Sequence, residues 1–191
     1  METRFFRWPR RISSAELRLN QEFRLLWEQH GAWTRMTIIS LVFGLPDTNF
    51  VVQRLLRNPD DFRRALEPFY GREAAFEFAH LLRDHLVIAS ELVTFAKKGD
   101  TRAAEDAERR WYVNADQIAA FLASINPFWS RNEWQRMLRE HLALVKREAV
   151  EMLQGQYEAS IQTYDEMEMQ ILTMADEMTR GIVKQFPRRF F

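Results

Sequence analysis

The fold is decided by residues 78–125, which read FAHLLRDHLVIASELVTFAKKGDTRAAEDAERRWYVNADQIAAFLASI. Apolar side chains recur here every three or four residues, the spacing of one face of an α-helix. The periodicity stops at Lys97-Lys98-Gly99, where two cations and a glycine are typical of a helix C-terminus. It resumes after Asp100 and stops again at Asn126-Pro127. The stretch therefore predicts two long helices joined by a tight turn.

The same reading extends to the rest of the chain. A capping box at residues 13–16 predicts a helix that reaches Gly44, and Ser130 predicts the start of another. Two short extra helices are expected at about 47–57 and 59–69. Gly155 is the one helix-breaking residue between two apolar stripes, so we expect a helix–Gly–helix hairpin there. No alternating run predicts a strand. The expected fold is all-α, an antiparallel up-and-down helical bundle.

Composition excludes several classes of function for this chain. The 191 residues are 47% apolar, carry zero formal net charge and include no cysteine. Disulfides, thiolate metal sites and cysteine nucleophiles are therefore excluded, and no overall field attracts nucleic acid. The most apolar stretch, residues 36–45, is half the length of a membrane span. We expect a single helical-bundle domain over 1–191, cytoplasmic, with arginine- and aromatic-rich tails at 1–12 and 187–191.

One polar residue lies at the centre of the apolar stripe of each long helix. These residues are His30, His85, Asn114, His141 and Glu168. Short loops make successive helices antiparallel, so residues at one height are mirror images about each turn. Reflecting position 85 about the turn at 99–100 gives 114, reflecting 114 about Pro127 gives about 141, and reflecting 141 about Gly155 gives 169. The sequence therefore predicts one polar layer inside the core.

A metal site is the first interpretation of this layer. Imidazoles from His30, His85 and His141, a carboxylate from Glu168, and Asn114 as a ligand or a supporting partner would suit iron, manganese or zinc. Such a protein would serve redox or sensing, and as an enzyme it would be a metal-dependent oxidoreductase. The alternatives are a buried hydrogen-bond network that fixes helix register in a non-catalytic structural or interaction protein, and a pocket for an organic ligand.

Two further carboxylates were candidates for the same chemistry. Glu77 and His80 have the Glu-x-x-His spacing of di-iron bundles, but both lie off the apolar stripe and there is no second copy. Glu148 lies two turns beyond His141, too far along the helix axis to share its ion. Its mirror level on the preceding helix is close to Arg110, which predicts a buried Glu148–Arg110 ion pair.

Several short motifs are distinctive in combination. They are Leu26-Trp27-Glu28-Gln29-His30, Trp33-Thr34-Arg35, Arg54-Leu55-Leu56-Arg57-Asn58-Pro59, Trp111-Tyr112 with Asn114-Ala115-Asp116, Asn126-Pro127 and Gln185-Phe186-Pro187. With them the chain resembles an uncharacterised bacterial all-helical family, some members of which are labelled acetylglutamate kinase. The residues oppose that label, because amino-acid kinases need strands and a glycine-rich phosphate loop. The core histidines are also similar to those of hemerythrin-like and ferritin-like bundles, whose full ligand sets are missing here.

The two ends share an unusual composition. Four arginines and three aromatic residues lie within residues 4–11, and two arginines with two phenylalanines follow Pro187. Aromatic side chains at this density typically mark an interface. We expect the tails to pack on each other or on a second subunit, in a homo-oligomer. Weak association with a membrane surface is the alternative, and no nucleic-acid partner is expected.

Overall fold

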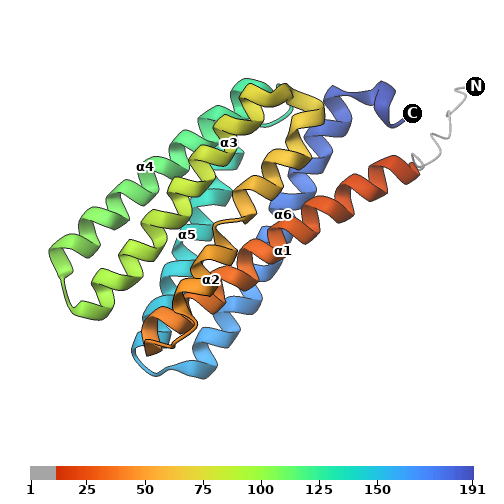
Figure 1. Cartoon of the computed structure of the whole chain (residues 1–191). Coiled ribbons are helices and arrows are strands. Elements are labelled where there is room, and N and C mark those ends of the chain that lie inside the picture. Colours follow the sequence, from red (N-terminus) through yellow and green to blue (C-terminus); the bar gives the residue numbers. More distant parts are fainter. Residues whose placement is uncertain (1–11) are drawn as a thin grey trace, which may run out of the picture.

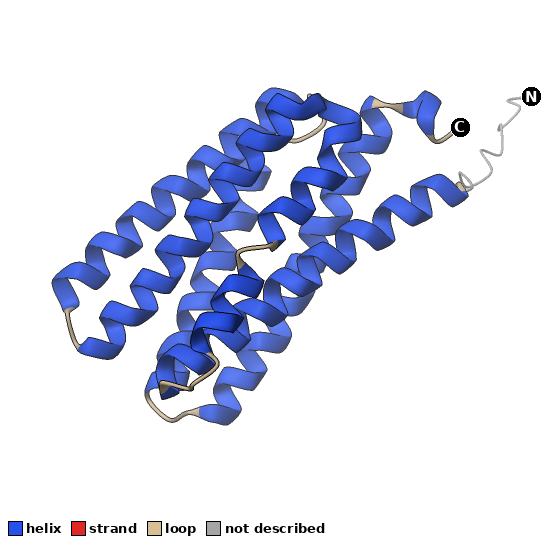
Figure 2. Cartoon of the chain, in the orientation of Figure 1, coloured by secondary structure: helices blue, strands red, loops and turns tan. Residues whose placement is uncertain are grey.

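A computed structural model describes residues 12–191, and six α-helices and one short 3-10 helix make up almost all of this part. Figure 2 shows helices joined by short loops, with no strand among the described residues. The helices are α1 (Ser14–Phe43), α2 (Thr48–Leu55), α3 (Asn58–Lys98), α4 (Thr101–Ile125), α5 (Arg131–Leu153) and α6 (Tyr157–Gln185), followed by η1 (Pro187–Arg189). The predicted all-α bundle is confirmed.

Helix boundaries follow the local chemistry of the chain. The Ser13 side chain accepts a hydrogen bond from the Glu16 backbone N–H, and Ser130 does the same for Glu133, so both predicted N-caps form. Gly155 has φ of 73°, a left-handed conformation that residues with a side chain rarely adopt. The helical stretch between residues 131 and 185 therefore breaks there into α5 and α6, as predicted.

The two short helices need one correction. The segment expected at 47–57 is α2, whereas the segment expected at 59–69 is the first part of α3. Gly71 has φ of 78° and ψ of 170°, which is not a helical conformation. The chain is helical on both sides of it, so this single residue introduces a kink into α3. Residues 58–70 and 72–98 are thus two arms of one kinked element.

The long helices form a closed ring around the core. Neighbours pack in the order α1, α3, α4, α5 and α6, and α6 packs on α1 to complete the ring. In Figure 1, α1, the second arm of α3 and α5 run in one direction, whereas α4 and α6 run in the other. The return along α2 and the first arm of α3 is what makes α1 and the second arm of α3 parallel.

Close packing around α6 depends on two glycines. A Cβ at Gly181 would lie 1.9 Å from Nε1 of Trp129, and one at Gly31 would lie 2.6 Å from Cδ1 of Ile171. Both distances are far below van der Waals contact, so only glycine allows the helices and the indole to approach this closely. No helix within residues 12–191 combines the length and the apolar character that crossing a membrane requires.

The C-terminal tail packs on its own chain. Phe190 is buried and stacks on Phe69 of α3, with ring centroids 6.1 Å apart, and the Arg189 guanidinium lies over the same ring. Phe190 therefore packs within its own chain, whereas Phe191 beside it is exposed. The N-terminal tail at 1–12 lies outside the described residues except for Ile12, and the homo-oligomer stays a prediction.

Candidate metal centre

Three of the predicted layer residues meet at the centre of the bundle. His30 on α1, His85 on α3 and His141 on α5 are each at most 2% exposed. One nitrogen from each ring lies within 4.8 Å of those of the other two. The ring centroids form a triangle with sides of 5.5, 6.2 and 6.4 Å. The three helices that carry these histidines are the three that run in the same direction.

An asparagine amide holds each of the first two rings. Nδ1 of His30 lies 3.1 Å from Oδ1 of Asn58, and Nδ1 of His85 lies 3.0 Å from Oδ1 of Asn114. The amide orientation is fixed independently, because Asn58 Nδ2 donates to the carbonyl of Leu26 (2.9 Å) and Asn114 Nδ2 to that of Leu81 (3.0 Å). The amide oxygens can only accept.

These bonds determine which ring nitrogen is free. Since the amide oxygens accept, Nδ1 of each ring must carry the proton and donate it. The neutral ring then has its lone pair on Nε2. Histidines that bind metals typically donate the other ring N–H to an oxygen in this manner, which fixes the tautomer and the ring orientation.

A glutamine completes a similar arrangement at the third histidine. Gln170 on α6 donates from Nε2 to the carbonyl of Met137, at 2.8 Å. Oε1 of Gln170 and Nδ1 of His141 are both buried without a hydrogen-bond partner. The Gln170 amide nevertheless opposes the lowering of the pKa of His141 that burial causes. The pair is therefore close but outside good hydrogen-bond geometry, and the third ring is held less firmly than the other two.

A similar arrangement of amide and carbonyl thus accompanies each of the three histidines, with the imidazole hydrogen bond formed in two of them. In each case the carbonyl that orients the amide belongs to the residue four positions before the histidine: Leu26 for His30, Leu81 for His85 and Met137 for His141. The amides come from the start of α3, from α4 and from α6. Six side chains from five helices consequently form one approximately threefold arrangement.

Burial keeps all three rings neutral. It lowers the pKa of His30 to about 4, against a smaller opposing effect of Asn58. It lowers the pKa of His85 to about 3, with a further contribution from the charge that His30 would carry, and it lowers the pKa of His141 well below its usual value. At neutral pH the layer therefore offers lone pairs and no positive charge.

A small cavity adjoins the three rings. Its volume is about 10 Å³, and its wall includes Trp27, Leu82 and Leu138, each three residues before a histidine on the same helix. Further wall residues are Phe78, Ile118, Leu122 and Trp134. Helical side chains tilt toward the N-terminus of their helix. The three histidines on parallel helices therefore all lean toward this cavity.

Glu168 does not join the histidines. It lies half-buried next to Glu28, and burial together with the charge of Glu168 raises the pKa of the Glu28 carboxyl. The described residues that bring ligand atoms together are the three histidines alone. Asn114 lies where a supporting partner would, on Nδ1 of His85, rather than in the ligand position.

The buried Glu148 pairs with a different arginine from the one predicted. Its Oε1 lies 2.6 Å from the Arg35 guanidinium, whereas Arg110 binds Asp106 and Glu91 at the surface. Burial raises the pKa of Glu148 to about 7, despite the opposing charge of Arg35. Height along the helix was predicted correctly, but α1 rather than α4 supplies the cation.

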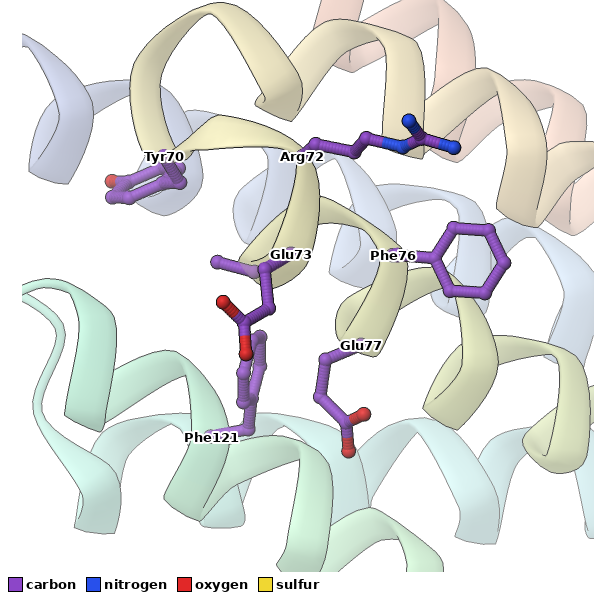
Figure 3. Close-up of a pocket in the computed structure, with 7 residues that line it drawn as sticks. Tyr70, Arg72, Glu73, Phe76, Glu77 and Phe121 are labelled. Atoms are coloured by element: carbon purple, nitrogen blue, oxygen red, sulfur yellow. The ribbon is translucent and has the colours of Figure 1, made fainter.

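Glu77 and His80 lie on a solvated flank of α3. Figure 3 shows the hollow beside the Gly71 kink, where the Glu73 side chain points toward Phe121 of α4 and the Glu77 carboxylate is turned away from that ring. Glu77 is exposed, and His80 faces Asp84 one turn on, at 3.5 Å. The two residues of the Glu-x-x-His motif therefore do not face the buried layer.

Sequence reasoning missed Asn58 and Gln170. Asn58 precedes a proline and was interpreted only as the start of a helix. Gln170 lies one position from the mirror level of His141, on the opposite side of that level from Glu168. The signal that the sequence offered for these residues was an amide side chain, rather than a carboxylate, near each level that mirrors a histidine.

Comparison of the chain with known protein families, with curated proteins and with solved structures finds no match. The all-helical fold agrees with the helical family that the motifs resemble. Membership of that family, its bacterial origin and the similarity to hemerythrin-like and ferritin-like bundles stay predictions.

Proposed function

We propose that this protein binds one transition-metal ion in its core, through Nε2 of His30, His85 and His141. The observation that carries the proposal is the repeated amide contact. Asn58 and Asn114 take up the Nδ1–H of two rings, and Gln170 lies beside the third. The lone pairs of His30 and His85 are thereby placed on Nε2, and one nitrogen of His141 lies within 4.8 Å of a nitrogen of each of these rings in the same buried layer.

The ligand set favours ions that accept nitrogen donors. Neutral imidazole suits zinc, copper, iron and nickel, whereas manganese prefers oxygen ligands. With Glu168 elsewhere, zinc and iron remain the better candidates among the three ions expected from the sequence. Metal–nitrogen bonds of about 2.1 Å place the nitrogens of a tetrahedral site roughly 3.4 Å apart. The ring nitrogens, which lie within 4.8 Å of one another, would have to move closer together on binding an ion.

The fourth coordination position would face the cavity. Three protein ligands and one open position are typical of zinc sites that bind an exogenous ligand. The cavity wall has no carboxylate and no nucleophile among the described residues, so we propose a binding protein rather than a hydrolase. Redox or sensing use would follow from the identity of the ion.

A purely structural network is the second candidate. It is favoured by the hydrogen bonds that already satisfy Nδ1 of His30 and His85. A network of this kind would fix the register of α1, α3, α4 and α5 without any ion. The network gives no role to the lone pairs of the ring nitrogens. The amount of metal bound therefore distinguishes it from a metal site.

Elemental analysis of protein purified without a histidine tag tests the proposal. We expect close to one equivalent of metal, either as isolated or after reconstitution of the apoprotein with zinc, iron or cobalt. His85→Gln removes a ligand while keeping a polar side chain and should abolish stoichiometric binding. The matched control is His80→Gln, an exposed histidine whose loss should leave the stoichiometry at one. Metal well below one equivalent in the reconstituted wild type, with a folded protein by circular dichroism, would support the network instead.

A further inference from the structure

An apolar pocket lies where the C-terminal ends of α3 and α5 meet the start of α4, and it shares no lining residue with the small cavity beside the histidines. Its volume is about 140 Å³. Four residues of its wall are each at most 7% exposed, namely Val93, Trp111, Val145 and Ala149. The exposed Thr101 and Lys146 also line it. The pocket therefore leads from solvent into the core.

Small side chains on all three helices leave this space open. Of the fourteen residues that line the pocket, four are alanine: Ala89 and Ala96 of α3, Ala104 of α4 and Ala149 of α5. Leucine, valine and the Trp111 indole form most of the remaining wall. An apolar cavity of about 150 Å³ can hold a benzene molecule. The pocket accordingly has room for a hydrocarbon group of about six carbon atoms.

The charges in the wall disfavour a charged ligand. Glu105, Glu108 and Lys146 are the charged residues that line the pocket. Lys146 Nζ lies 2.6 Å from Oε1 of Glu108, so the one lining cation already has a carboxylate partner. A head group of either sign would meet a like charge in this wall, which is unfavourable. An uncharged molecule avoids that cost and still buries its hydrocarbon group.

The pocket lies one helical turn from the histidine layer. Ala89 is four residues after His85 on α3. Val145 is four residues after His141 on α5. Residues four apart lie on one face of a helix, one above the other. Trp111 belongs to both places, because it lines the pocket and its ring lies 5.3 Å from that of His85.

We propose that this pocket is a binding site for an uncharged hydrophobic small molecule, and that Trp111 couples its occupancy to the histidine layer. Binding of the molecule does not depend on the metal site, whereas the coupling rests on it. A molecule in the pocket packs on the indole and restrains it against the His85 ring. The two ligands should then strengthen each other's binding by the same factor.

Titration of the full chain with small alcohols, followed by NMR, tests the site. The probes are n-butanol and n-hexanol, with hexanoate as the anion of matched length. Each further buried methylene group should strengthen binding about fourfold, and n-hexanol should bind more tightly than hexanoate. The indole N–H signal of Trp111, identified by its loss in Trp111→Phe, should shift as the site saturates. Equal affinity for the three probes would overturn the proposal.

Leucine substitutions fill the pocket. Ala104→Leu and Ala149→Leu should each weaken n-hexanol binding roughly tenfold, because the added side chain takes the place of about two methylene groups of the ligand. Ala143→Leu is the matched control on α5, since Ala143 is exposed and outside the wall, and it should keep the wild-type affinity. Circular dichroism identifies a variant that does not fold, and the other filling variant then decides. Wild-type affinity in both filling variants would contradict the site.

The coupling has a separate measurement, the affinity for cobalt(II) with and without saturating n-hexanol. We expect cobalt to bind about fivefold more tightly when the alcohol is present. An unchanged cobalt affinity in a protein that binds n-hexanol contradicts the coupling alone. A wild-type protein that binds no cobalt contradicts the metal site, and the alcohol titrations still decide whether the pocket is a binding site.

Discussion

Acidification should unfold the metal-free protein because of the three buried histidines. The folded-state pKa is about 4 for His30 and about 3 for His85, and that of His141 is also well below the ordinary value of 6.5. In the unfolded chain these rings take up protons below about pH 6.5. A depressed folded pKa means that stability is present above pH 6.5 and is lost as the pH falls toward the folded values.

The size of the effect follows from the number of protons. Three rings that bind protons only when unfolded would cost about 4 kcal/mol per pH unit. Glu148 acts in the opposite direction between pH 4.5 and 7, because burial raises its pKa to about 7 and the folded protein keeps that proton. The net loss is about 3 kcal/mol per pH unit between roughly pH 6 and 4.5. Total stability of a typical domain is about 5–15 kcal/mol, so unfolding near pH 4–5 is expected.

Urea unfolding at pH 7, 6, 5.5 and 5, in the presence of a chelator, measures this slope. His141→Gln removes one of the three proton-binding groups and should reduce the slope by about 1.4 kcal/mol per pH unit. His80→Gln, at an exposed histidine, should leave the slope unchanged. The reasoning is refuted if the stability of the wild type does not change between pH 7 and 5, or if both variants have the wild-type slope.

Three further predictions concern other parts of the core. Relative to Glu148→Gln, the wild type should gain about 2–3 kcal/mol of stability as the pH falls from 8 to 5, because a raised pKa stabilises the folded state below it; parallel urea titrations with a constant difference would contradict this. Gly181→Ala should cost about 1–3 kcal/mol, since its Cβ meets Trp129 at 1.9 Å, and an unchanged urea midpoint would oppose it. Phe190→Ala should cost about 2 kcal/mol through lost packing on Phe69, and an unaltered melting temperature would show that the tail contributes nothing.

The sequence predicts the position of a residue along its helix better than it predicts which residues of other helices lie beside it. Periodicity and caps predict the helices, and mirror images about each turn predict that His85, Asn114 and His141 share a level. The direction in which a side chain points around its helix axis is less certain. Positions 168 and 170 differ by about 200° around the axis, and the residue that lies beside His141 is Gln170.

Connections that are not simple hairpins account for the other differences. Mirror reasoning assumes that each helix packs beside the next one in the chain. The bundle closes into a ring, so α1 packs on α6 and also contacts α5, where Arg35 meets Glu148. Asn58 reaches His30 because α2 and the first arm of α3 fold back along α1. Both contacts join helices that are not consecutive in the chain.

The direction of the three histidine-bearing helices has a kinetic consequence. Because α1, the second arm of α3 and α5 are parallel, all three rings tilt toward the same end of the bundle, where Trp27, Leu82 and Leu138 border the small cavity. An ion entering from that side must pass the layer of Trp27, Leu82 and Leu138. Those side chains have to move apart before anything passes, so capture and release should take place on the timescale of local opening of the bundle. An ion once bound would therefore exchange slowly, whatever its affinity at equilibrium.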